Sequence, residues 1–289
     1  MSQRVYLIDV SIYFFKYYFA LPDNWWSEEG NPTAGVYGYA NWLKRMLADL
    51  NPSYIAACFD ESLTTCFRND IYPDYKSSRV LPDDLLAFQL TASRQVTEAL
   101  GIPCYASATH EADDLLGTLA VRAASKGLEV CVLSRDKDLS QLISCETAQL
   151  WDYPDGIPMK RAQIHEKLGV WPEQVVDLLA LVGDVGDDIP GVPGVGVKTA
   201  AQLLTHMPSW AEVRSNIPAV ANLPIRGAKS LAAKLEAYQD QVDMAYQLAR
   251  IDCKAPLGRR FSLARTQVKR AQLRQLAASL GFPPSFAEV

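Results

Sequence analysis

The sequence is poor in histidine and has no closely paired cysteines. Its 289 residues contain three histidines and six cysteines. No two cysteines have the C-x-x-C spacing, and no histidine stands where it would complete a zinc site. Little is therefore left for histidine-based catalysis or metal ligation. We expect the six thiols to be reduced, small apolar side chains in a cytoplasmic protein.

Long hydrophobic runs are also missing. No window of about 18 apolar residues occurs, so we expect no membrane span. The apolar run at residues 5–22 is interrupted by Asp9 and Lys16 and lacks a clear cleavage site, so it does not fit a signal peptide. With 49% hydrophobic and 21% charged residues, the chain fits a soluble globular protein of one large or two modest domains.

The net charge of −5 is unevenly distributed. Residues 1–189 carry 15 basic and 27 acidic side chains, a net charge of −12, whereas residues 190–289 carry 13 and 6, a net charge of +7. An acidic first part and a basic second part favour cations bound to one and a polyanion bound to the other. Drift in surface composition would produce the same asymmetry without any ligand.

Short apolar runs alternate with helical patterns in the first part of the chain. Three runs are typical of buried strands: residues 4–9, 53–60 and 129–136. Three amphipathic helices are predicted at residues 35–50, 83–101 and 111–127. This alternation predicts an α/β domain with a mainly parallel sheet flanked by helices, at residues 1–171. A helical region is expected at residues 172–289.

Each predicted strand ends at an aspartate. One such residue could simply form a turn or cap a helix, but three together favour a site, because sites in open α/β sheets lie beyond the carboxyl ends of the strands. Further acids lie at the start of the helix at 111 and after the third strand. Two more lie three residues apart at 184 and 187, where a helical turn would point both side chains the same way. The candidate site thus gathers nine carboxylates: Asp9, Asp60, Glu111, Asp113, Asp114, Asp136, Asp138, Asp184 and Asp187.

So many carboxylates would repel one another and shift their pKa values upward unless cations intervened. Sites made only of carboxylates suit Mg²⁺ or Mn²⁺. Nine are too many for one Mg²⁺, so we expect two or more ions. Two ions about 3.5–4 Å apart are the usual arrangement for attack of water on a phosphodiester. The acids therefore predict metal-dependent phosphoryl chemistry.

A glycine-rich loop, GVPGVGVKTA at residues 191–200, follows the last acids. It is not a nucleotide P-loop, because Val197 precedes Lys198 and a helix at residues 172–184, rather than a strand, is expected before it. It fits a helix–hairpin–helix at about residues 184–206, in which glycines 194 and 196 allow a phosphate to approach and the next helix points its amides at the anion. Such hairpins hold the duplex backbone without reading bases.

Six segments in order match a known set of motifs: LIDVSIYFFKYYFALP, FDESLTTCFRNDIYPDYKSSRVLPDDL, HEADDLLGTLA, SRDKDLSQLI, LALVGDVGDDIPGVPGVGVKTA and RGAKSLAAKLEAYQDQV. Through these motifs, which cover most of the chain, the sequence resembles the flap endonuclease / 5′-nuclease family. The resemblance is closest to the 5′–3′ exonuclease domain of bacterial DNA polymerase I. It implies a PIN-like sheet and a structure-specific DNA 5′-nuclease that hydrolyses phosphodiesters with two Mg²⁺ ions, for which Mn²⁺ can substitute.

The resemblance also implies roles for individual residues. One metal position would be formed by Asp9, Asp60, Glu111 and Asp113, with Asp114 close by, and the second by Asp136, Asp138, Asp184 and Asp187. An arch or gateway segment, residues 68–100, would cover the site. Three basic residues would act at or near the scissile phosphate: Lys76, Arg79 and Arg68.

DNA contacts follow from the same resemblance. Phe15 would stack on the terminal base and Lys16 would contact DNA. Phe15 could equally belong to the core of its helix. The hairpin would bind the backbone through Gly191, Val192, Gly194, Gly196, Lys198 and Thr199. A K⁺ ion would lie between the hairpin and the DNA, and a monomer is expected.

The sequence departs from the polymerase relatives at several positions. Val10 and Ile12 stand where small residues are usual, and Ser134–Arg135 replaces a common Thr–Gly pair. Both changes are close to the predicted metal sites. No polymerase follows, so we expect a free-standing nuclease.

Two other functions stay open at this point. A PIN-like ribonuclease would share the sheet and acids, and a non-catalytic DNA-binding relative would keep the fold without cutting. A basic tail favours binding of a duplex backbone, although it could also be a solvated helix: Arg259, Arg260, Arg265, Lys269, Arg270 and Arg274. The loop residues Trp25 and Trp26 could line a pocket for the 5′ end, but we favour packing against the core.

Overall fold

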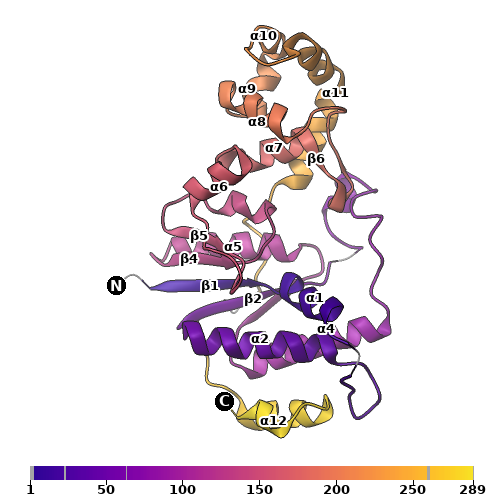
Figure 1. Cartoon of the computed structure of the whole chain (residues 1–289), viewed down its shortest axis with the longest axis vertical. Coiled ribbons are helices and arrows are strands. Elements are labelled where there is room, and N and C mark those ends of the chain that lie inside the picture. The colour runs from indigo at the N-terminus through magenta and orange to yellow at the C-terminus, as the bar shows by residue number, and fades with distance from the viewer. Residues whose placement is uncertain (1–2, 23, 63, 259–260, 289) are drawn as a thin grey trace.

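The computed structural model describes residues 3–22, 24–62, 64–258 and 261–288. Arg259 and Arg260 of the basic tail lie outside these described residues. Five parallel strands form a central sheet in the order β3–β2–β1–β4–β5 (Figure 1). They are β1 (Arg4–Asp9), β2 (Tyr54–Asp60), β3 (Cys104–Ser107), β4 (Glu129–Leu133) and β5 (Ala148–Trp151).

Helices cover both faces of this sheet because side chains alternate between the faces along each strand. Ile8 and Ile55 belong to one core, and Leu7 and Ala56 to the other. The first core lies under α1 (Val10–Ala20), α2 (Ala34–Leu50), α4 (Asp84–Ala99) and α12 (Arg270–Ser279). The second lies under α5 (Ala112–Ala124). The predicted α/β architecture with a mainly parallel sheet is confirmed.

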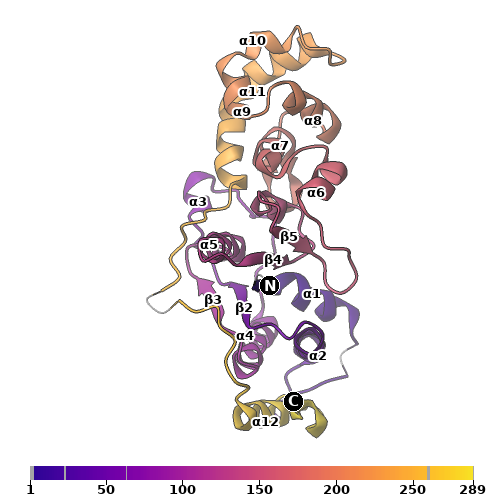
Figure 2. The same ribbon diagram turned by 90° about the vertical axis from the view of Figure 1, so that its left-hand side faces the viewer.

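A second, helical body with its own core stands beyond one edge of the sheet, at the top of Figures 1 and 2. Two short antiparallel strands, β6 (Gly183–Asp184) and β7 (Ile189–Pro190), connect two of its helices. Its helices are α7 (Val175–Val182), α8 (Val197–His206), α9 (Trp210–Ser215), α10 (Ile217–Val220) and α11 (Ala228–Ala249). The preceding helix α6 (Arg161–Leu168) packs its buried Ile164 in the core beneath α5. Short 3₁₀ turns complete the fold: η1 (Asp138–Leu142), η2 (Pro172–Gln174), η3 (Val185–Asp187) and η4 (Pro284–Ala287).

The chain returns to the α/β body after α11, which differs from our grouping of residues 172–289 in one helical region. Ile251 and Leu263 pack in the core beneath α5, and Leu273 and Phe282 pack in the core beneath α2. Figure 2 shows this segment running down past α5 and β3 to α12, at the opposite end of the molecule from α8 to α10. The described members of the basic tail therefore lie on the α/β body and not beside the hairpin.

Two predicted elements end earlier than the hydrophobic pattern indicated. The strand expected at 129–136 ends at Leu133. Ser134 still donates its N–H to Trp151 O of β5, while its hydroxyl group bonds Asp9 and the chain turns away from the sheet. The helix expected before the hairpin is a 3₁₀ turn followed by α7, which ends at Val182. In the described part of the chain, none of the helices has the length and apolar character needed to cross a membrane.

Candidate nuclease site

The carboxyl edge of the sheet brings Asp9 and Asp60 together, because β1 and β2 are adjacent parallel strands. Asp9 is buried and accepts hydrogen bonds from Ser11 Oγ and Ser134 Oγ, both at 2.8 Å. Ser134 thus supplies a hydroxyl group at the position where we noted a departure from the relatives. Asp60 accepts a bond of 2.7 Å from the backbone N–H of Ala112, which joins the end of β2 to the start of α5.

The first turn of α5 adds Glu111 and Asp113 to this edge. Glu111 is the N-cap of the helix and Asp113 lies in its first turn, where acids are favoured by the helix dipole. Glu111 and Asp113 line one pocket together with three acids from elsewhere: Asp138, Asp184 and Asp187. Strands, α5 and the β6–β7 connection therefore converge on one cluster of carboxylates.

The later acids come from two turns. Asp136 follows β4, and its Oδ1 accepts the N–H of Asp138 at 2.9 Å. Asp184 ends β6 and accepts the N–H of Gly186 at 2.8 Å, so it caps the η3 turn that carries Asp187. The helical turn expected over 184–187 is this single 3₁₀ turn.

Burial and mutual repulsion shift four of these carboxyl groups. Burial, with the charge of Asp60, raises the pKa of Asp9 to about 7. Burial, with the charges of Asp136 and Asp184, raises the pKa of Asp138 to about 7. The pKa values of Asp113 and Asp60 are also raised. Burial is the largest cause in both cases, and neighbouring carboxylates add to it. The site is thus short of positive charge.

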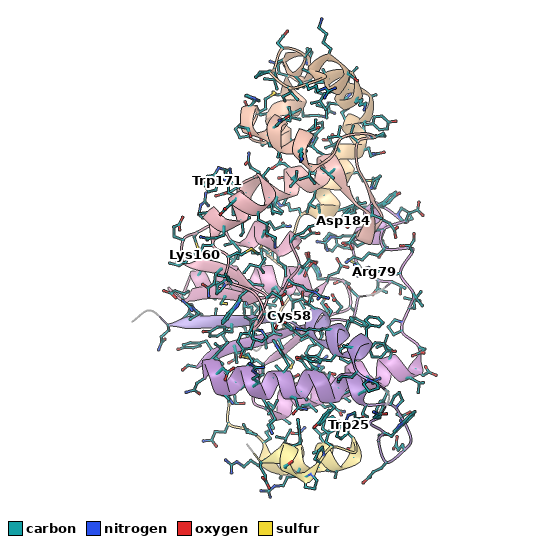
Figure 3. The ribbon with its side chains drawn as sticks, viewed as in Figure 1. Trp25, Cys58, Arg79, Lys160, Trp171 and Asp184 are labelled. Atoms are coloured by element: carbon teal, nitrogen blue, oxygen red, sulfur yellow. The ribbon has the colours of Figure 1, made fainter. Side chains whose placement is uncertain are left out.

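A turn of the predicted gateway segment, residues 75–79, is docked against these acids; we call it the gateway turn. Lys76 Nζ lies 2.5 Å from Glu111 Oε1 and 3.5 Å from Asp187 Oδ2. Arg79 Nη2 lies 2.6 Å from Asp187 Oδ1. In Figure 3, Arg79 and Asp184 lie on the same side of the molecule, where the gateway segment passes β6. Two cations expected at a phosphate therefore contact the carboxylates in this structure.

The backbone of the gateway turn is bound to the same loop. The N–H of Lys76, a residue with a positive φ of 54°, donates to Asp187 O at 3.0 Å. The N–H of Ser78 donates to Asp188 Oδ2 at 2.9 Å. The rest of the gateway segment is different, since α4 packs through Ala92 and Val96 in the core beneath α2. Only the chain between α3 (Arg68–Ile71) and α4 stands over the site.

The donor set fits hard divalent ions. Within the described residues, no three carboxylate, imidazole or thiolate groups already stand in a metal-holding geometry. Lys76, Arg79 and Lys137 are paired with the acids instead, and Lys137 Nζ lies 3.0 Å from Asp184 Oδ2. Asp138 Oδ1, however, is buried and lacks any hydrogen-bond partner, which is costly unless a cation binds it. Oxygen-only donors of this kind suit Mg²⁺.

Arg68 and Asp114 are placed differently from what the resemblance implied. Arg68 is only 2% exposed and Asp114 is fully buried. They form a two-pronged ion pair with distances of 2.7 and 2.8 Å. Arg68 therefore has no surface on which to meet a phosphate, and Asp114 has no free oxygen to offer a metal ion.

The helix α1 carries the predicted contacts for a DNA end. Phe15 is half-buried and stacks on Phe19, with ring centroids 5.8 Å apart. Lys16 is paired with Asp155. Of the two tryptophans, Trp25 stacks on Tyr37 at 3.9 Å, whereas Trp26 is 52% exposed.

The predicted hairpin follows β7. A Cβ atom on Gly191 would lie 2.0 Å from Val182 O, so this position requires glycine. Gly194 has a φ of +75°, and Lys234 of α11 approaches it. Gly196 and Lys198 are exposed at the start of α8. The cap residue Gly196 has no side chain that could accept a bond from the first amides of this helix, so these amides face outward. Val192 is buried and Thr199 half-buried, so these two support the hairpin from inside.

Two site residues were missed in the sequence. Tyr75 OH donates to Glu111 Oε2 at 2.8 Å and to Asp187 Oδ2 at 3.3 Å. Lys137 pairs with Asp184 across 47 residues. Each stands next to a residue whose role the resemblance implies, Tyr75 beside Lys76 in DYKSSR and Lys137 between two acids in SRDKD.

Two adjoining family models match the chain. The model of the 5′-3′ exonuclease N-terminal resolvase-like domain matches residues 4–169, and that of the 5′-3′ exonuclease C-terminal SAM fold matches residues 170–273. A "5′-3′ exonuclease" of Buchnera aphidicola subsp. Schizaphis graminum is 35% identical over 257 residues, covering 89% of this chain and 88% of that protein. DNA polymerase I of Pseudomonas aeruginosa is 40% identical over 254 residues, but the match spans only 27% of the polymerase.

Solved structures share the fold at low sequence identity. The T5 D15 protein co-crystallised with metal ions has a TM-score of 0.68 at 17% identity, over 87% of this chain and 90% of that chain. The catalytic core of Rad2 in complex with DNA substrate has a TM-score of 0.64 at 13% identity, over 99% and 90% of the respective chains. The arrangement of sheet and helical body is therefore shared with both of these structures.

Proposed function

Because this chain belongs to the 5′-3′ exonuclease family, we propose that it is a structure-specific DNA 5′-nuclease, an exonuclease and flap endonuclease. It would hydrolyse a phosphodiester near a junction of single-stranded and duplex DNA, leaving a 5′-phosphate and a 3′-hydroxyl. The observation that carries this proposal is the convergence of eight carboxylates at the carboxyl edge of the sheet, next to a gateway turn with two cations.

Two or more divalent ions, Mg²⁺ or in its place Mn²⁺, are proposed as cofactors. Bound here, they would supply an activated water and stabilise charge on the attacking and leaving oxygens. Asp9, Asp60, Glu111 and Asp113 are proposed for one position, and Asp136, Asp138, Asp184 and Asp187 for the other. The raised pKa values of four of these acids and the partnerless Asp138 Oδ1 support this assignment.

The basic residues of the gateway turn are proposed to exchange partners when substrate and ions bind. Lys76 and Arg79 now neutralise Glu111 and Asp187. Once ions take over that role, the ammonium and guanidinium groups can orient the scissile phosphate and stabilise its charge. Phe15 and Lys16 are proposed to meet the 5′ end beside them, the aromatic ring by stacking on a base.

The hairpin is proposed to hold the duplex backbone through Gly194, Gly196, Lys198 and the first amides of α8. Gly191, Val192 and Thr199 shape that loop. We place a K⁺ ion at the 191–196 turn, between its carbonyl oxygens and the DNA. The protein is proposed to act as a monomer in the cytoplasm, in keeping with its six free thiols.

Cleavage of labelled DNA tests the proposal. A duplex with a 5′ flap should be cut in Mg²⁺ or Mn²⁺ and left intact in EDTA, and a matched RNA duplex should be cut far more slowly. Asp184→Asn should lower kcat/KM on the flap at least 100-fold, in line with loss of electrostatic stabilisation at a reacting oxygen, while duplex binding is retained. Full activity of this variant, or equal cutting of RNA, would contradict the proposal.

A further inference from the structure

The buried ion pair between Arg68 and Asp114 lies directly behind a proposed metal ligand. Arg68 Nη1 is 2.7 Å from Asp114 Oδ2 and 3.2 Å from Glu111 Oε2, so one guanidinium nitrogen is shared between two carboxylates. The shorter contact goes to Asp114. Glu111 points its other oxygen, Oε1, toward the gateway turn and the pocket.

Both oxygens of Asp114 are fully used. Oδ1 accepts Arg68 Nη2 at 2.8 Å and the N–H of Asp252 at 2.8 Å. Oδ2 accepts Arg68 Nη1 at 2.7 Å and the N–H of Glu111 at 3.1 Å. A fully buried carboxylate with two bonds to each oxygen has no lone pair directed at an ion. Asp114 is therefore part of the support behind the site.

Arg68 is held in place from a third direction. Its Nε donates to Leu248 O at 2.7 Å, and its Nη2 donates to Arg250 O at 2.9 Å. These carbonyls lie at the end of α11, so the guanidinium joins the helical body to α5 of the α/β body. The charge of Arg68 is therefore fixed next to Glu111 and cannot move away into solvent.

We infer that Asp114 is a positioning residue that neutralises Arg68, so that Glu111 keeps its negative charge for a divalent ion. Without the charge of Asp114, the buried guanidinium would pair with Glu111, because an uncompensated buried charge takes the nearest available partner. Glu111 would then become a weaker metal ligand. This inference depends on the proposed function in one respect, the assignment of Glu111 to a metal position.

A double-mutant cycle on the full chain tests the inference without measuring cleavage. Mn²⁺ binding to the DNA-free protein is measured by calorimetry and by electron paramagnetic resonance. Asp114→Asn should weaken Mn²⁺ affinity about 10- to 100-fold, as is typical for loss of a group that orients a ligand. The double variant Arg68→Gln/Asp114→Asn should return to within a few-fold of the wild-type affinity, because the competing cation is gone.

The double variant decides the question even if the single variant does not fold, because replacing both members of a buried ion pair leaves no unpaired charge. Asp252→Asn is the matched control: its side chain contacts Lys254 and His110, and its Mn²⁺ affinity should be unchanged. A double variant with the weak affinity expected of a lost ligand would overturn the inference. Wild-type protein that binds no Mn²⁺ and cuts no flap would instead overturn the proposed function.

Discussion

Gly196→Ala should separate DNA binding from folding. Gly196 has φ and ψ values of −100° and 173°, which alanine adopts readily, and a Cβ atom built there would meet nothing within 4 Å. The free energy of unfolding should change by less than about 1 kcal/mol, since loss of a glycine cap and a stiffer unfolded chain act in opposite directions. The new methyl group would stand where a phosphate must approach the first amides of α8.

The expected loss in DNA affinity follows from one charged hydrogen bond. A backbone N–H bond to an anion contributes about 1.5–3 kcal/mol, so loss of one bond should raise Kd for duplex DNA about 10- to 100-fold. Fluorescence anisotropy with a labelled flap duplex in Ca²⁺ measures Kd, and calorimetric melting measures stability in the same samples.

Gly191→Ala is the matched comparison, because its Cβ atom would lie 2.0 Å from Val182 O. It should lower the free energy of unfolding by about 1–3 kcal/mol, the usual cost of overpacking. If Gly196→Ala binds DNA as tightly as the wild type and melts at the same temperature, the hairpin does not hold phosphate through these amides.

Three further expectations concern ions and the gateway turn. In EDTA, the free energy of unfolding should fall as the pH rises from about 4 to about 7. The reason is that Asp9 and Asp138, with pKa values raised to about 7, hold protons in the folded state that the unfolded chain has released. Calorimetry should show that Mg²⁺ reduces this fall. Replacing K⁺ by Na⁺ at equal ionic strength should weaken duplex binding in the anisotropy assay, and equal Kd values would contradict the K⁺ site. Asp188→Gly removes the acceptor of the Ser78 N–H and suits the positive φ of 55° at this position. Trypsin should then cut after Lys76 several-fold faster in metal-free protein without a fall in melting temperature. An unchanged cutting rate would show that this bond does not restrain the turn.

The fold and the gathering of acids could be predicted because both follow from local patterns. Buried strands are read from their apolar runs, and parallel strands bring their carboxyl ends to one edge. Asp9 and Asp60 were therefore predictable neighbours even though 51 positions separate them in the chain. The hairpin could also be predicted from the sequence, because its glycines stand at positions such as 191 and 194. A Cβ atom would clash with the backbone at 191, and the positive φ at 194 favours glycine.

The partners of individual charges could not be predicted in this way. Arg68 lies 46 residues from Asp114 and 180 from Leu248, and no local pattern distinguishes a buried arginine from one that faces a phosphate. The same holds for Lys76, whose contact with Glu111 depends on how a turn docks on another body. The return of residues 251–258 and 261–288 to the α/β body was missed because short apolar segments do not reveal which core they join.

The length of α11 sets the distance between the hairpin and the carboxylate pocket. Leu248 and Ala249 line the carboxylate pocket, and Lys234 approaches Gly194 in the hairpin. The 14 residues from 234 to 248 span about 21 Å at 1.5 Å per residue. A duplex lying alongside this helix advances one base pair in about 3.4 Å, so its phosphates would be gripped roughly six base pairs from the bond that is cut. Lengthening or shortening α11 by a full turn would then shift that interval by between one and two base pairs.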